Sequence, residues 1–319
     1  RMIVLYASRF RNGEIDLKTK KSGQKIKEPI GERVFNIFNN VFMFLIMIIM
    51  VYPMWYVLVA SFSESQKMVG FEGIMWLPRG LSLDSYRLMA KNPMVLRGYL
   101  NTIYIVVVSV SLNIIFTAIG AYFLSRKNVM WQKYVMIMVT LTMFFSGGMI
   151  PDYLTFTKIY HLRNSYWVLI LPGLINTFNL IVMRTSFASI PDSLCESATI
   201  DGAGHWRVLF SIVLPLSKAV MAVIILYYAV AHWNEWFNAS IYLSDRTKYP
   251  LQLILREILI SNDTTSMTAG NVDARANKES VAETIKYATI VVATVPILCV
   301  YPFLQKYFTK GTLIGAVKE

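Results

Sequence analysis

Long runs of apolar residues, separated by shorter polar stretches, dominate the chain. Six such runs lie at about 36–60, 100–124, 133–150, 165–184, 219–243 and 285–305. An α-helix needs about 20 residues to cross the roughly 30 Å hydrocarbon layer of a bilayer. The pattern therefore predicts an all-α, polytopic membrane protein with six transmembrane helices.

The composition supports a membrane protein rather than a soluble one. Of the 319 residues, 55% are apolar and 16% are charged, and the mean hydropathy is +0.47. Soluble domains carry about 25% charged residues. The two cysteines, Cys195 and Cys299, show no CxxC spacing and no clustered histidines, so we expect neither a metal site nor a disulfide.

The formal net charge of +12 reflects where the basic residues lie. They gather in the N-terminal segment 1–34 and in the loops between apolar runs, which argues against nucleic acid as a partner. An even number of spans puts both termini on one side of the membrane, and basic segments favour the cytoplasmic side. We therefore expect cytoplasmic termini, with the loops 63–98 and 244–284 outside and the connection 189–218 inside.

The connection 189–218 carries helical patterning of its own and reads SIPDSLCESATIDGAGHWRVLFSIVLPLSK. Pro191 suits the first turn of a helix that runs to about Ile200, and Gly202 offers the left-handed residue that ends it. A second, amphipathic helix begins near Gly204, and Pro215 ends or kinks it. Its apolar face is expected to hold Trp206, Leu209, Phe210 and Val213.

Three short motifs in this connection resemble the EAA loop of ABC importer permeases. They are Glu196-Ser197-Ala198, Asp201-Gly202-Ala203 and Leu214-Pro215, with Ser197 in place of the first alanine of the family pattern. The tail 304–318 and the run 231–239 (AHWNEWFNA) are similar to segments of the second permease of maltose-type carbohydrate importers. The resemblance covers 35–319 as one six-span permease domain and leaves 1–34 as a cytoplasmic segment.

The resemblance implies the type I ABC importer (MetI-like) fold in a bacterial cytoplasmic membrane, and import of oligosaccharides by alternating access. It also implies four partners besides membrane lipid: a second, different permease, an ABC ATPase dimer, a solute-binding lipoprotein and the sugar. ATP and Mg would be bound by the ATPase, and this chain would hold no cofactor. The residues that the resemblance assigns to ATPase coupling are Glu196, Ser197, Ala198, Asp201, Gly202, Ala203 and Pro215.

Polar residues inside the predicted spans are candidates for the substrate pathway, because such side chains usually face a bundle interior or a water-filled route. The candidates are Trp233, Asn234, Glu235, Trp236, Asn238 and Asn179. Two alternatives stay open. The aromatic residues could form an interfacial belt, and Asn113, Asn176 and Asn179 could form hydrogen bonds between helices.

No GxxxxGK[ST] phosphate-binding loop occurs in the sequence, so the chain is expected to be a transport subunit without an ATPase site. An ABC permease for an amino acid or osmolyte is the alternative within the class. An ion-coupled secondary transporter would need acids near mid-membrane, where Glu235 stands alone. An intramembrane metalloenzyme would need a second histidine beside His232 and Glu235, and that helix has none.

Overall fold

The computed structural model describes residues 30–68, 71, 73–127, 129–261, 284–299 and 302. The chain divides at Pro53 into two parts, Arg1–Pro53 and Met54–Glu319. Helix α2 (Ile30–Ser61) contributes to both. Its turns before Pro53 are apolar and almost entirely exposed, which is typical of a helix that faces lipid or another membrane subunit.

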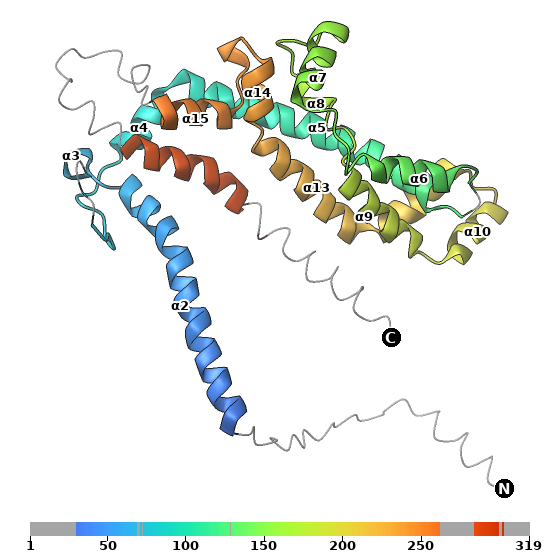
Figure 1. Ribbon diagram of the computed structural model, residues 1–319, viewed down its shortest axis with the longest axis horizontal. Helices are drawn as coiled ribbons and strands as arrows, with labels where there is room; N and C mark the ends of the chain where they lie inside the picture. Colours follow the sequence, from blue (N-terminus) through green and yellow to red (C-terminus); the bar gives the residue numbers. More distant parts are fainter. Residues whose placement is uncertain are drawn as a thin grey trace. The chain divides into compact units, whose positions relative to one another are not determined.

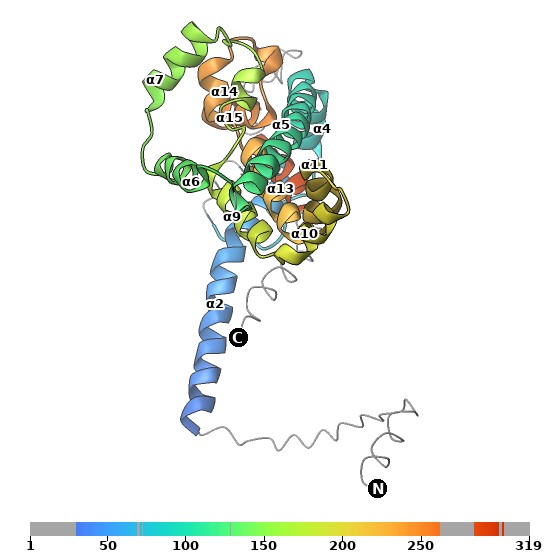
Figure 2. The ribbon, with the colours of Figure 1, turned by 90° about the vertical axis from the view of Figure 1, so that its right-hand side faces the viewer.

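Helix α5 (Pro93–Ser125) is the central element of the second part and packs against α9 (Thr177–Ala188), α13 (Lys218–Trp233) and α15 (Leu251–Ser261) (Figures 1 and 2). Asn92 caps the start of α5 by accepting a hydrogen bond from the Met94 N–H at 2.9 Å, and Pro93 occupies the first turn. Small side chains line its buried face and let the neighbouring helices approach closely. These are Gly98, Thr102, Ser109, Thr117, Ala118 and Ala121.

Polar side chains link α5 to its neighbours inside the bundle. Asn113 Nδ2 lies 2.9 Å from His232 Nε2, and both residues are buried. The Thr117 hydroxyl lies 2.8 Å from the Tyr228 hydroxyl, which also accepts the Asn176 N–H at 2.9 Å. The interpretation of Asn113 as a hydrogen-bonding residue between helices is confirmed, because its amide joins α5 to α13.

The prediction of six continuous spans is not confirmed. Among the described residues, only α2 and α5 are long and apolar enough to cross a membrane, or three if α13 is joined to the segment before it. The expected span 133–150 gives α6 (Gln132–Leu141) and then α7 (Met149–Leu154), which continues into a π-helix, η1 (Thr155–Ile159). The span 165–184 divides into α8 (Trp167–Ile170) and α9, and the span 219–243 into α13 and α14 (Phe237–Tyr242).

Local residue choices explain these breaks. Gly147 and Gly148 separate α6 from α7, and Gly148 adopts φ 88°, where a side chain is strained. Pro172 and Gly173 fall between α8 and α9, and Asn176 then caps α9 by accepting the Asn179 N–H at 3.1 Å. Average hydrophobicity over a window does not register these signals.

Residues 244–261 of the expected polar loop 244–284 form regular structure. They contain a short 3₁₀ helix, η3 (Arg246–Lys248), and α15, whose apolar side packs with α4 (Asp84–Lys91), α5 and the helix Thr284–Cys299. A short helix, α3 (Ser65–Met68), follows α2. No strand occurs within the described part of the chain, where Ser63 and Leu81 form one isolated bridge. The tail 304–318 that carries part of the resemblance lies outside the described residues.

Candidate functional sites: a capped surface helix and a broken fifth span

The motif Glu196 to Ala203 forms the end of α10 (Asp192–Ile200) and the turn after it. Gly202 has φ 81°, its N–H donates to the Thr199 carbonyl at 3.0 Å, and the Ala203 N–H donates to the Ala198 carbonyl at 2.9 Å. This pair of bonds is the Schellman arrangement that ends a helix. The prediction that Gly202 ends the helix in a left-handed conformation is confirmed.

One side of α10 packs against the bundle and the other faces outward. Cys195 is buried, and Ala198 packs against the same core cluster as Leu209 and Phe187. Leu194, four residues before Ala198, is 44% exposed, so it does not share the buried side of the helix with Ala198. The outward side holds Glu196, Ser197, Ile200, Asp201 and Gly202, with Ile200 86% exposed.

The second helical segment contains a π-helical turn that changes the face it buries. It consists of α11 (His205–Val208), the π-helix η2 (Leu209–Val213) and α12 (Leu214–Leu216). Leu209 and Val213 are buried as expected, whereas Trp206 and Phe210 stack on each other in the exposed region, so the predicted four-residue face is wrong for these two. The extra residue in the π turn shifts the register of the helix.

Pro215 stands at the end of this segment. Just before it, the Leu214 N–H bonds to the Leu209 carbonyl, five residues back, which fits a ladder widened ahead of a proline. The chain then bends by 86° between Leu216 and Lys218. Asp201 does not cap the second helix, because the cap position is Gly204 and no side chain bonds there.

An ion pair joins α10 to the connection after α5. Lys127 Nζ donates to Asp192 Oδ2 at 2.8 Å, and both side chains are largely exposed. The hydrogen bond and the charge of Lys127 lower the pKa of the Asp192 carboxyl, and Asp192 raises the pKa of Lys127 in return. The pair therefore links the first residue of α10 to the residues that directly follow the end of α5.

A cavity of about 1050 Å³ lies beside this pair, between the end of α5, α10 and α11. Arg126, Glu196 and Trp206 are among the residues that line it. The Arg126 guanidinium sits 4.5 Å from the centre of the Tyr122 ring, and its Nε and Nη2 atoms are buried without a hydrogen-bond partner in the part of the chain that the structure describes. Sequence reasoning missed Arg126, whose position carries no motif.

The pathway candidates of the expected fifth span gather at the break between α13 and α14. Asn234 and Asn238 are exposed, while Glu235 and Trp236 are half-buried. Asn234 Nδ2 bonds to the Val230 carbonyl at 2.9 Å, and Glu235 Oε1 accepts the Asn238 N–H at 3.2 Å. The break thus presents amides, a carboxylate and an indole side by side.

Two other pathway candidates lie in packed surroundings. The Trp233 indole N–H donates to the Ala293 carbonyl at 3.3 Å, and the ring packs beside Tyr99. Asn179 is 5% exposed, and its backbone N–H donates to the Asn176 side chain that caps α9. The contacts of Trp233 hold its ring against neighbouring helices, and the Asn179 side chain is buried in the bundle.

Helix α15 adds two residues to this break that sequence reasoning did not single out. Gln252 Nε2 donates to Asn234 Oδ1 at 3.4 Å, and Arg256 stacks on Trp236 with 3.3 Å from its guanidinium carbon to the ring centre. In the sequence, Arg256 is one of many charged residues in the polar stretch 244–284. The contact depends on where α15 packs, and no local pattern encodes that position.

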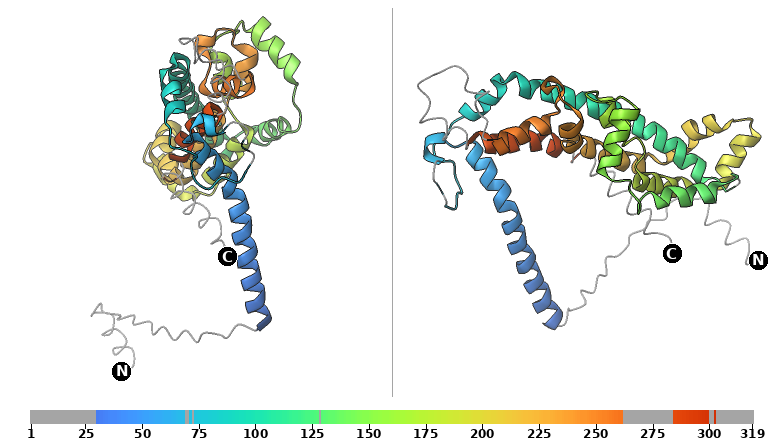
Figure 3. Two further views of the ribbon diagram at one scale, coloured as in Figure 1. Left: turned by 90° about the vertical axis from the view of Figure 1, so that its left-hand side faces the viewer. Right: turned by 45° about the horizontal axis from the view of Figure 1, so that its top comes forward.

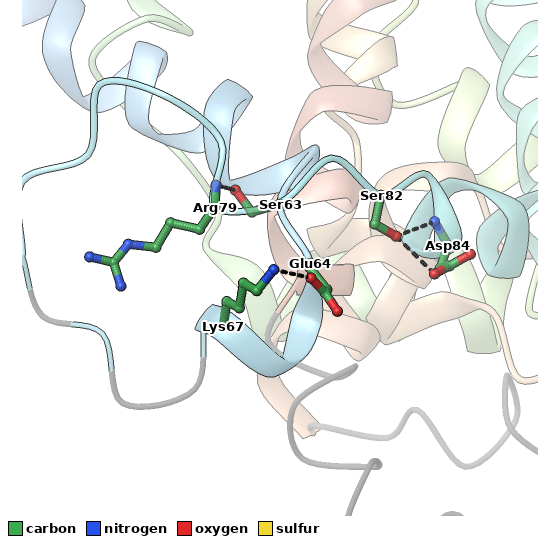
Figure 4. Close-up of polar contacts among 6 residues, drawn as sticks. All are labelled: Ser63, Glu64, Lys67, Arg79, Ser82 and Asp84. Carbon is green, nitrogen blue, oxygen red and sulfur yellow. Dashed lines mark hydrogen bonds and ion pairs between the residues drawn. The ribbon is translucent and has the colours of Figure 1, made fainter.

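A polar cleft of about 660 Å³ occurs near α3 and α4. Figure 4 shows its charged groups paired locally: Glu64 with Lys67 at 2.6 Å, and Asp84 with Ser82 at 2.8 Å. The Ser63 hydroxyl accepts the Arg79 N–H at 3.1 Å. These bonds fold the segment after α2 back on itself.

The EAA-like loop and the α5-centred bundle lie at residues that match one protein family. The model for the binding-protein-dependent transport system inner membrane component matches residues 23–314. The chain therefore belongs to this family of ABC importer permeases.

Relatives and a solved structure agree with the family. The chain is 40% identical to the polygalacturonan/rhamnogalacturonan transport system permease protein YtcP of Bacillus subtilis (strain 168), over 90% of this chain and 99% of the relative. It is 41% identical to Protein LplC of the same strain, over 90% and 95%. A chain of a bacterial ABC transporter that imports the acidic polysaccharide alginate matches with a TM-score of 0.80 at 29% identity, over 88% and 98%.

Proposed function

We propose that the chain is one of two different membrane-spanning subunits of an importer for oligosaccharides, driven by a separate ABC ATPase and supplied by a solute-binding lipoprotein. The family match over residues 23–314 carries this proposal. The carbohydrate substrates in the names of the 40% identical relative and of the solved alginate importer support a sugar as cargo. Galacturonan and alginate are both polymers of carboxylated sugars.

The coupling role falls to α10 and the turn after it. A rigid element transmits motion better than a flexible loop, and the Schellman turn at Gly202 with the buried Cys195 fixes α10 on the bundle. Its outward side, with Glu196 and Asp201, is available to a docking ATPase.

The arrangement of the second part supports the expected topology. α4 and α15 lie at one end of α5, and α10 lies at the opposite end (Figures 1 and 3). The expected outer segments and the expected inner connection therefore occupy opposite ends of one long helix. In the six-span topology, α6 with α7, α8 with α9, and α13 with α14 would act as broken spans.

We assign the pathway surface to the break between α13 and α14. Broken helices are where transporters place substrate groups, because freed backbone and polar side chains line a cavity there. Asn234 and Asn238 supply exposed amides for sugar hydroxyls, and Trp236 supplies an apolar ring for a sugar face. Trp233, held against Tyr99 and Ala293, borders this surface.

The test is to extract the tagged chain from its native membrane in mild detergent and to identify co-purifying proteins by mass spectrometry. We expect an ABC ATPase and a second permease, with ATP hydrolysis in the purified sample. Recovery of the chain alone, without ATPase activity, would contradict the proposal and favour a self-contained transporter.

A further inference from the structure

One face of α15 lies against the break in the fifth span. Gln252 and Arg256 are four residues apart and therefore share a face of the helix. Gln252 contacts Asn234 and Arg256 contacts Trp236, so the two contacts align α15 with both sides of the break. The apolar side of α15, with Leu251 and Leu255 buried, anchors it in the bundle.

The stacking geometry determines what the Arg256 guanidinium can still bind. Its carbon lies 3.3 Å from the centre of the Trp236 ring, so the indole face covers one flat side of the group. The N–H groups of a guanidinium lie in its plane and point outward from the edge, where they form paired hydrogen bonds with a carboxylate. Stacking therefore fixes Arg256 and leaves its donor edge for a ligand.

Nearby acids do not use this donor edge. Within the described residues, Arg256 forms no ion pair. Glu257 pairs with Arg246 at 2.6 Å, and the Glu235 carboxylate accepts the Asn238 N–H at 3.2 Å. Arg256 is thus a half-buried cation held in place beside exposed amides.

We infer that Arg256, held by Trp236, recognises a carboxylate on the transported sugar and so selects acidic oligosaccharides over neutral ones. This inference rests on the proposed function, because it needs the break to line the sugar route. A neutral sugar requires only amides and an aromatic face, which Asn234, Asn238 and Trp236 already provide. A guanidinium held in place can in addition bind the carboxylate of a uronate, through charge and paired hydrogen bonds.

The experiment compares two probes, fluorescently labelled trigalacturonate and its methyl ester, which has the same sugar chain with each carboxylate converted to an uncharged ester. Binding is measured on the assembled transporter in detergent, without the binding protein, for the wild type and for Arg256→Gln, Arg256→Lys and Arg246→Gln. We expect Arg256→Gln to weaken trigalacturonate binding about tenfold or more and to leave the ester within about twofold, since hydrogen bonds to charged groups have this magnitude. Arg256→Lys should fall between them, because lysine keeps the charge and lacks the fork.

Arg246→Gln is the matched control, since Arg246 lies on the same segment and is paired with Glu257. It should leave the preference for the acidic probe intact. Equal losses for both probes in Arg256→Gln would make Arg256 a structural support and overturn the inference, and so would unchanged binding of trigalacturonate. If the wild-type complex binds neither probe nor a neutral trisaccharide, the sugar assignment itself fails, and the inference falls with it.

Discussion

Gly202 has a left-handed backbone conformation and also lies on the proposed docking surface. Its φ of 81° lies in the left-handed region, and a Cβ added there would meet no atom within 4 Å. A side chain would therefore cost about 1 kcal/mol through the backbone and nothing through collision. Any larger effect on transport must come from the surface that Gly202 presents to a partner.

The matched pair Gly202→Ala and Gly204→Ala tests this distinction. Gly204 has equally open space but a φ of −72°, which any residue adopts, so its substitution should be neutral. We expect Gly202→Ala to reach the membrane at normal levels while sugar-stimulated ATP hydrolysis falls several-fold. Gly202→Asp should abolish uptake, because it adds a charge at the docking surface. Normal uptake by the Gly202→Asp variant would refute the docking role.

At the scale of elements, α10 depends on its tie to the connection after α5. The pair between Lys127 and Asp192 is exposed, so its contribution to folding stability is small, and its value lies in orienting α10. Such an ion pair allows a movement of α10 to be transmitted to α5, the helix against which α9, α13 and α15 pack. The pair links the proposed coupling surface to the proposed pathway.

Charge reversal tests the tie. Lys127→Glu and Asp192→Lys should each lower the coupling of ATP hydrolysis to sugar uptake, and the double variant should restore most of it, because the pair is reformed in the opposite sense. Uptake per ATP hydrolysed in proteoliposomes is the measurement. A double variant no better than the single ones would show that the pair does not carry the motion.

The pair also has a predictable pH dependence. Because Lys127 lowers the pKa of Asp192, the carboxylate stays charged at neutral and mildly acidic pH. The contribution of the pair is present above the ordinary aspartate pKa and is lost only as the pH falls through the lowered value. Coupling should therefore not change around neutral pH on account of this pair.

At the scale of the whole molecule, the two ends of α5 are expected to face opposite sides of the membrane. Ser193 on α10 and Ala90 at the end of α4 are both exposed and mark the two ends. Such positions are accessible to a label that does not cross the bilayer. The described cysteines are Cys195, which is buried, and Cys299, which is exposed and needs replacement first.

Labelling with a membrane-impermeant maleimide gives the orientation. In a Cys299→Ser background, Ala90→Cys should react in intact cells, and Ser193→Cys should react only in inside-out vesicles. The physical reason is that the basic segments favour the cytoplasmic side. Reaction of both variants from the same side would contradict the arrangement about α5, and the reverse pattern would invert the assigned orientation.

The membrane class, the helix ending at Gly202 and the proline bend were predictable from the sequence because each depends on neighbouring residues. The length of an apolar run indicates whether a helix can cross a bilayer. Gly202 and Pro215 favour backbone conformations that few other residues tolerate. The hydrogen bond of Asn113 between two helices was predictable because a buried amide favours a polar partner.

Tertiary structure decided what local pattern could not. The break after α13, the packing of Trp233 against Tyr99 and the exposure of Trp206 follow from which helices pack together. In the sequence, Arg256 is one charge in a polar loop, and only the packing of α15 brings it onto the Trp236 ring. The sequence by itself determined the membrane class and the EAA-like motif through local signals, whereas the long-range packing of apolar faces determined which side chains meet at the proposed sugar route.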